Sequence, residues 1–189
     1  MIKEGILAIR KFVRQYLFKI DDRSPLERAI DNGLKIGKNV HIMEGCNIDA
    51  GHCFLINIGN NVSLGPNVCV LAHDASMKRE LNYVRIAPVC IKDNVFVGAG
   101  SIILPGITIG ENVIIGAGSV VTHDIPSNVV ACGVPAVVCG TYDDFMHKHK
   151  EKMAQAHLFD ESYKIDVIST EKREKMIAIL NKEGVGYII

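Results

Sequence analysis

The sequence IKDNVFVGAGSIILPGIT at residues 91–108 is followed directly by IGENVIIGAGSVVTHDIP at residues 109–126. Aligned without a gap, the two segments are identical at eight of eighteen positions, including the whole of Gly-Ala-Gly-Ser. Because strand side chains alternate between faces, an aliphatic residue at every sixth position predicts short strands separated by bends. Those aliphatic residues are Ile91, Val97, Ile103, Ile109, Ile115 and Val121.

The same six-residue spacing extends toward the N-terminus. It holds at Ile36, Ile42 and Ile48 and, after a slip at Phe54, at Ile58, Leu64 and Val70. Three sides of six residues close a coil of eighteen, and each coil buries its aliphatic residues only against the coils above and below. The sequence therefore predicts an all-β solenoid over residues 34–140.

Composition excludes several classes of protein. The 189 residues include 21 basic and 21 acidic side chains, so no basic surplus supports nucleic-acid binding. The apolar run Ile6–Ile9 is too short for a membrane span or a signal-peptide core, which predicts no transmembrane segment and a cytoplasmic protein. The six cysteines form no C-x-x-C pair, and we interpret them as reduced packing residues rather than metal ligands or disulfides.

Two flanking segments lack the repeat. Within residues 1–33, the stretch 2–20 carries aliphatic residues at helical spacing and predicts an amphipathic helix with a basic face. Residues 141–189 are polar and charged and predict a helical extension. Thr141 is placed to cap its first helix, and a second helix is expected near residues 171–180.

The repeat is interrupted once by a long segment. After Val70 the aliphatic spacing returns only at Ile91, so residues 74–88 are predicted to leave the wall as a loop. His73 stands at the base of this loop. Imidazole suits general base catalysis near neutral pH, although a lone histidine is also common as a structural residue.

The pattern of an aliphatic residue, Gly or an acidic residue, any two residues, a small residue and any residue resembles the hexapeptide-repeat family. This resemblance covers residues 34–140 and implies a left-handed parallel β-helix, a hand opposite to that of usual crossover connections. The segment Leu64-Gly65-Pro66-Asn67-Val68 before His73 is similar to one in maltose, galactoside and surface-polysaccharide O-acetyltransferases. It implies direct acetyl transfer from acetyl-CoA to a sugar or saccharide hydroxyl, with His73 as general base.

The resemblance also implies the other site residues. Asn47 matches a residue that contacts the acceptor or supports the reaction centre. Tyr83 and Arg85 are candidates from their place in the predicted loop, and the sequence does not choose between contact with the acceptor and contact with the coenzyme. Bound acetyl-CoA is expected along the glycine-rich tracts, where a backbone N–H at Ala99 would stabilise the oxyanion. The full set expected at the coenzyme is Phe96, Ala99, Ala117, Thr122 and His123.

Two other functions fit the same architecture. A zinc enzyme of the γ-carbonic anhydrase type needs three histidine ligands, but the nearest histidines in sequence to His73 are His52 and His123. We therefore predict no metal. A noncatalytic β-helix scaffold is the other alternative. In either case the apolar sides of the coil favour a closed homotrimer, and the acetyltransferase family implies active sites between its subunits.

Overall fold

The aliphatic ladder forms the inside of a three-sided coil. The computed structural model describes residues 23–189 and divides the chain into two compact units that meet between Cys139 and Gly140. Each unit is described by itself. The helix predicted over residues 2–20 lies outside the described residues.

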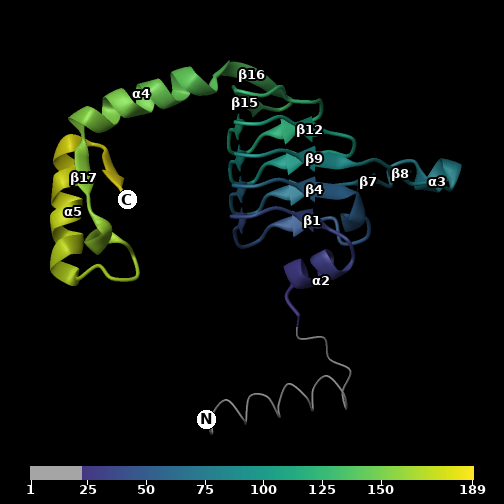
Figure 1. The fold of residues 1–189 in the computed structure, drawn as a ribbon, viewed down its shortest axis with the longest axis horizontal. Coiled ribbons are helices and arrows are strands. Elements are labelled where there is room, and N and C mark those ends of the chain that lie inside the picture. Colours follow the sequence, from purple (N-terminus) through teal and green to yellow (C-terminus); the bar gives the residue numbers. More distant parts are fainter. Residues whose placement is uncertain (1–22) are drawn as a thin grey trace, which may run out of the picture. The chain divides into compact units, whose positions relative to one another are not determined.

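Three sheets form the walls of the coil, with parallel pairing between strands of successive coils (Figure 1). Sheet A contains β1 (Lys35–Ile36), β4 (Ile56–Ile58), β9 (Val89–Ile91) and β12 (Thr108–Ile109). Sheet B contains β2 (His41–Ile42), β5 (Ser63–Leu64), β10 (Phe96–Val97), β13 (Ile114–Ile115), β15 (Val129–Gly133) and β16 (Ala136–Thr141). Sheet C contains β3 (Asn47–Ile48), β6 (Cys69–Val70), β11 (Ile102–Ile103) and β14 (Val120–Val121).

The predicted ladder residues stack in register. Val97 aligns with Ile115 across β10 and β13, and Ile103 aligns with Val121 across β11 and β14. These residues are fully buried. Ser101 and Ser119 are also buried, and both hydroxyl groups donate to the Gly116 carbonyl oxygen. Because the polar atoms in the core are hydrogen-bonded, the small inward positions tolerate serine.

One corner of the coil is a ladder of asparagines. Their φ angles lie between 53° and 64°, a region that asparagine tolerates better than most residues. Each side-chain amide donates to the next asparagine at 2.8–3.1 Å. The members of this asparagine ladder are Asn39, Asn61, Asn94, Asn112 and Asn128.

The glycine that follows an aliphatic residue meets a different need. A Cβ atom at Gly98 would lie 2.4 Å from the Ala117 nitrogen, so glycine permits close approach of neighbouring coils there. Asparagine, rather than this glycine, adopts the positive φ at the ladder corner.

The coils are not all the same length. Successive members of the asparagine ladder are 22, 33, 18 and 16 residues apart. The extra residues of the first coil, which is longer than eighteen, include the 3-10 helix η1 (Cys53–Leu55). The extra residues of the second coil form an arm of β7 (His73–Asp74), α3 (Lys78–Leu81) and β8 (Arg85–Ile86), in which β7 and β8 pair antiparallel (Figure 1). The interrupted segment is thus an ordered hairpin.

Helix α2 (Pro25–Asp31) precedes the first coil. Ser24 caps it, and Ser24 and Glu27 form a capping box. None of the helices in the described part of the chain is both long and apolar enough to cross a membrane.

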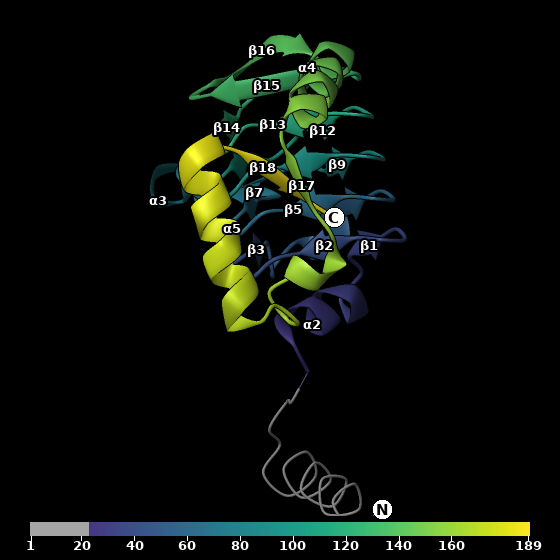
Figure 2. The ribbon, with the colours of Figure 1, turned by 90° about the vertical axis from the view of Figure 1, so that its left-hand side faces the viewer.

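The second unit contains more than helices. Thr141 caps α4 (Tyr142–Gln155), and α5 (Thr170–Glu183) ends at Gly184. Between and after them lie β17 (His157–Phe159), η2 (Glu161–Tyr163) and β18 (Gly186–Ile188). β17 and β18 pair in parallel beside α5 (Figures 1 and 2). The extension thus contains the two predicted helices, and its apolar C-terminal segment also pairs its backbone with β17.

The cysteines also differ from expectation. All six are free thiols; Cys53 is buried and Cys46, Cys69 and Cys90 are partly buried. Cys132 and Cys139 are exposed, so interpreting them as packing residues is wrong. They lie on β15 and β16, the last two strands of sheet B, which no later coil covers.

Candidate active site

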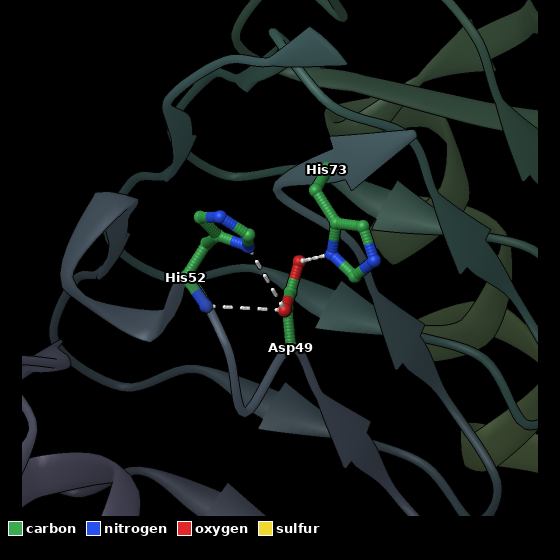
Figure 3. Close-up of side chains that lie close together, drawn as sticks. All are labelled: Asp49, His52 and His73. Atoms are coloured by element: carbon green, nitrogen blue, oxygen red, sulfur yellow. Dashed lines mark hydrogen bonds and ion pairs between the residues drawn. The ribbon is translucent and has the colours of Figure 1, made fainter. Parts of the chain in front are cut away.

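His73 lies beside a carboxylate from the preceding coil. It begins the arm just after β6, and Asp49 follows β3, the strand that pairs with β6. The imidazole Nδ1 contacts Asp49 Oδ2 directly (Figure 3). Asp49 and His73 therefore meet at the corner that follows sheet C, although 24 residues separate them.

Asp49 is held by backbone N–H groups on both oxygens. Its Oδ1 accepts from Gly51 N at 3.1 Å and His52 N at 3.2 Å, and its Oδ2 accepts from Ala72 N at 3.0 Å. Only 3% of Asp49 is exposed. Burial acts to raise the pKa of the Asp49 carboxyl, but the hydrogen bonds from the His73 side chain and from the backbone N–H groups of Ala72 and His52 lower the pKa below its ordinary value.

This carboxylate orients the imidazole. An ionised carboxylate can only accept a hydrogen bond, so His73 Nδ1 carries the proton and Nε2 keeps its lone pair. The His73 side chain is 38% exposed, so a hydroxyl group from solution has access to the ring. The pair has the arrangement of a histidine general base whose ring is oriented by a carboxylate.

His52 is the second histidine at this corner. Its ring centroid lies 5.0 Å from that of His73, and its Nδ1 lies 3.8 Å from Asp49 Oδ1 (Figure 3). That nitrogen is buried and has no hydrogen-bond partner within residues 23–189. Treating His52 as remote from His73 because of its place in the sequence is thus wrong. The longer first coil brings it close.

Asp49, His52 and His73 are also the residues that could hold a metal ion. One donor atom from each lies within 4.8 Å of the others. The set is two histidines and a carboxylate, whereas the zinc alternative required three histidines. The Asp49 oxygens already accept three backbone N–H groups and the His73 ring, so this set does not fit the three-histidine site.

Asp49 could not be found from the sequence pattern. The position after an aliphatic ladder residue accepts either glycine or an acidic residue, so Asp49 after Ile48 satisfies the repeat like any wall residue. The only local signal is that it lies in a coil of 22 residues, one of three coils whose length departs from eighteen.

Asn47 lies near this corner but makes a separate contact. It is exposed on β3, and its amide lies 3.8 Å from Cys69 Sγ. It also lines a pocket of about 220 Å³ with residues from α2, among them Leu26 and Ala29. The position is compatible with acceptor contact, but the structure shows no hydrogen bond between Asn47 and His73 among the described residues.

Tyr83 and Arg85 lie on the arm. Tyr83 is 77% exposed. Arg85 is opposite Asp74 in the hairpin, and its Nη2 donates to the Pro105 carbonyl oxygen at 3.4 Å. Arg85 therefore connects the arm to the wall, while Tyr83 is open to solvent.

The glycine-rich tracts occupy the corner between sheets B and C. Ala99 and Ala117 are exposed there, and Gly118 N donates to the Ala99 carbonyl at 2.8 Å. Within residues 23–189, neither alanine N–H donates a hydrogen bond. Cβ atoms at Gly65 and Gly98 would lie 2.8 and 2.4 Å from the Ala99 and Ala117 nitrogens, so these two amides pack closely against the preceding coil.

The residues expected to bind the coenzyme do not all lie at one corner of the coil. Phe96 is exposed on the outer face of sheet B. Thr122 and His123 follow β14 at the same corner as His73, and Thr122 Oγ1 is 2.8 Å from His123 Nδ1. Ala99 lies at the other edge of sheet C, so one chain does not bring Ala99 and His73 together.

Comparison with known proteins identifies related chains. Residues 91–123 match the family model "Bacterial transferase hexapeptide (six repeats)". Galactoside O-acetyltransferase of Lactococcus lactis is 40% identical over 140 residues, 69% of this chain and 62% of that protein. The Escherichia coli galactoside O-acetyltransferase is 36% identical over 145 residues, 75% of this chain and 66% of that protein. This chain thus spans slightly under two thirds of these relatives.

A solved structure is similar as well. A galactoside acetyltransferase in complex with coenzyme A shares 30% sequence identity and has a TM-score of 0.50. The match covers 74% of this chain and 82% of that one.

Proposed function

The chain belongs to the hexapeptide-repeat acetyltransferase family, and on that premise we propose that it transfers the acetyl group of acetyl-CoA to a hydroxyl of a sugar or saccharide precursor. The family fold is the left-handed parallel β-helix implied by the resemblance. The observation that carries the proposal is the Asp49–His73 pair, in which a buried carboxylate orients a half-exposed imidazole.

The proposed reaction is a direct transfer. His73 Nε2 takes the proton of the acceptor hydroxyl as its oxygen attacks the thioester carbonyl. Asp49 stabilises the imidazolium that forms. The tetrahedral intermediate then expels the coenzyme thiolate, which receives the proton from His73, leaving the acetyl ester and free coenzyme A. No protein group becomes acetylated.

We place the donor along the corner between sheets B and C. The small, exposed side chains of Ala99 and Ala117 support this placement, because they leave room for a pantetheine arm along the corner. The family resemblance assigns the oxyanion to the Ala99 N–H. Phe96 on sheet B adjoins this corner, whereas Thr122 and His123, at the His73 corner, would contact the donor from the neighbouring subunit. Replacing the exposed Ala117 with Trp should weaken acetyl-CoA binding, as measured by calorimetry, and unchanged affinity in a folded variant would place the donor elsewhere.

The site then requires more than one copy of the chain. Because Ala99 and His73 lie at opposite edges of sheet C, we propose a cyclic homotrimer in which one subunit supplies the base and its neighbour supplies the tract. Light scattering should report three chains per particle, and a monomer at working concentration would contradict the arrangement. A cytoplasmic location and a part in polysaccharide synthesis belong to the same proposal.

We place the acceptor at the corner where the arm leaves the wall. Asn47 and Tyr83 are exposed there or on the arm, and Arg85 anchors the arm to Pro105. A panel of glycosyl acceptors, incubated with acetyl-CoA and scored by mass gain, identifies the sugar and hydroxyl.

The deciding experiment compares His73→Ala with His41→Ala. His41 is an exposed histidine on β2 in the wall and lies outside the proposed site. We expect His73→Ala to lower kcat by about 10² or more while acetyl-CoA affinity is kept, and His41→Ala to leave both unchanged. Near wild-type turnover by His73→Ala, or an acetyl group accumulating on a cysteine, would show the mechanism to be wrong.

A zinc-dependent reaction is tested in parallel. Because Asp49 is engaged by His73 and three N–H groups, no catalytic step is assigned to a metal. Dialysis against a chelator should leave acetyl transfer unchanged. Elemental analysis measures the zinc content of the chain before and after dialysis. Bound zinc found by elemental analysis of the untreated chain would favour the carbonic anhydrase type of site.

A further inference from the structure

Cys132 and Cys139 face each other across a hairpin. Cys132 is on β15 and Cys139 on β16, adjacent strands in sheet B. Their sulfur atoms lie 3.5 Å apart, and the Cys139 thiol also lies 3.4 Å from the Val130 carbonyl oxygen. Within residues 23–189, no other two cysteines form a hydrogen bond with each other.

We propose that Cys132 and Cys139 are an oxidant-sensitive dithiol, a modification site at which a peroxide forms a disulfide. One thiolate attacks a peroxide oxygen, and the O–O bond breaks to give a sulfenic acid and, with hydrogen peroxide, one water. The second thiol attacks the sulfenic sulfur and expels a second water as the S–S bond forms. The two sulfurs lose two electrons in total, and hydrogen peroxide is reduced to two waters.

The local structure holds the two thiols in place. A Cβ atom at Gly116 would lie 2.7 Å from the Cys132 Cβ, so Cys132 packs directly on the coil below. Gly133 N donates to Ser119 Oγ at 3.1 Å and fixes the strand next to Cys132. Bond formation must bring the two sulfur atoms from 3.5 Å to the S–S length of about 2.05 Å.

Cys132 affects the reactivity of Cys139. The neighbouring Cys132 sulfur raises the pKa of the Cys139 thiol above its ordinary value, and desolvation adds to this. A thiol that stays protonated reacts more slowly than a thiolate. Disulfide formation should therefore be faster in mildly alkaline solution.

The other cysteines lack these features. Cys53 is buried, and its sulfur lies 3.4 Å from the Ala29 carbonyl oxygen. Cys46 and Cys69 are partly buried in the coil. Because thiol oxidation requires access as well as thiolate character, these side chains should resist a dose that oxidises the exposed pair. The disulfide closes a short loop and is exposed, so a dithiol reductant should reverse it.

The experiment treats the reduced full-length chain with hydrogen peroxide, then denatures it and alkylates the remaining thiols. We expect four labelled cysteines instead of six, a mass lower by about 2 Da before alkylation, and a cross-link between Cys132 and Cys139 in the digest. Dithiothreitol should restore all six labels.

Variants distinguish this pair from general oxidation. Cys132→Ser and Cys139→Ser should each form no disulfide within the chain, and the control Cys53→Ser should still lose two labels. The proposal is overturned if the wild-type chain keeps six labels while free glutathione in the same tube is oxidised. It is also overturned if the lost thiols appear as disulfides between chains or as sulfinic acids.

Discussion

Two carboxylates connect neighbouring coils, one in the regular wall and one at the candidate site. Asp93 in the wall accepts from the backbone N and the side-chain amide of Asn60 at 2.8 and 3.0 Å. Asp49 at the site accepts from backbone N–H groups and from the His73 imidazole. Hydrogen bonds lower the pKa of both carboxyl groups. A carboxylate that accepts hydrogen bonds from a neighbouring coil is thus common to both places. Only Asp49 has a partner, His73, that can exchange a proton.

The two regions also differ in coil length. The asparagine ladder keeps a spacing of eighteen residues from Asn94 to Asn112, within the wall. Around the site the spacings are 22 and 33 residues. His52 lies in the first longer coil and His73 in the second. The proposed catalytic residue His73 therefore lies where the repeat is broken, and the coils on either side keep the regular wall.

The largest effect that separates wall from arm is on stability. Ile103→Ala in the wall removes a fully buried side chain and should lower the free energy of unfolding by about 2–5 kcal/mol. Ile86→Ala on the arm, where the side chain is exposed, should change it by about 0.5 kcal/mol or less. Urea denaturation measures both, and equal losses would show that the arm belongs to the cooperative core.

The two carboxylates give the sharpest test of function. Asp49→Asn should lower kcat by about 10², because an amide no longer dictates which His73 nitrogen carries the proton. Asp93→Asn is the matched control and should leave kcat unchanged. Steady-state rates at saturating acetyl-CoA are the measurement. Equal rates for the two variants would refute the positioning role of Asp49.

The asparagine ladder should have a smaller effect. Asn94→Ala places an ordinary residue at a φ of 58° and should cost about 1–2 kcal/mol of unfolding free energy. Asn94→Gly keeps the backbone conformation while losing the same side-chain hydrogen bonds, so it should cost less. If both variants lose the same stability, the hydrogen bonds rather than the backbone angle matter most at this corner.

The smallest expected effect is on how the free energy of unfolding depends on pH in the acid range. The pKa of Asp49 is lowered in the folded chain, so its stabilising contribution is complete above the ordinary aspartate pKa of about 3.9 and is lost as pH falls through the folded value. The stability difference between wild type and Asp49→Asn should therefore shrink in that acid range. Denaturation curves at several pH values test this, and a difference that persists unchanged in strong acid would contradict it.

The wall could be predicted from the sequence because its period is local. The six-residue spacing through Val97, Ile103 and Ile115 shows directly which side chains face inward, and these three are buried. The Asp49–His73 contact spans 24 residues and depends on the lengths of two irregular coils, which a period does not encode. The β17–β18 pair was missed for the same reason, since it joins His157 to Gly186 across most of the second unit.

The unequal spacing of the asparagine ladder has a consequence for how such proteins diversify. Its members remain hydrogen-bonded whether 16 or 33 residues separate them, so the ladder does not depend on the length of the intervening chain. An arm can then be lengthened, shortened or exchanged by recombination at one corner while the inherited wall is kept. If the arm contacts the acceptor as we propose, exchange of this one segment between relatives should change acceptor preference while the wall is kept.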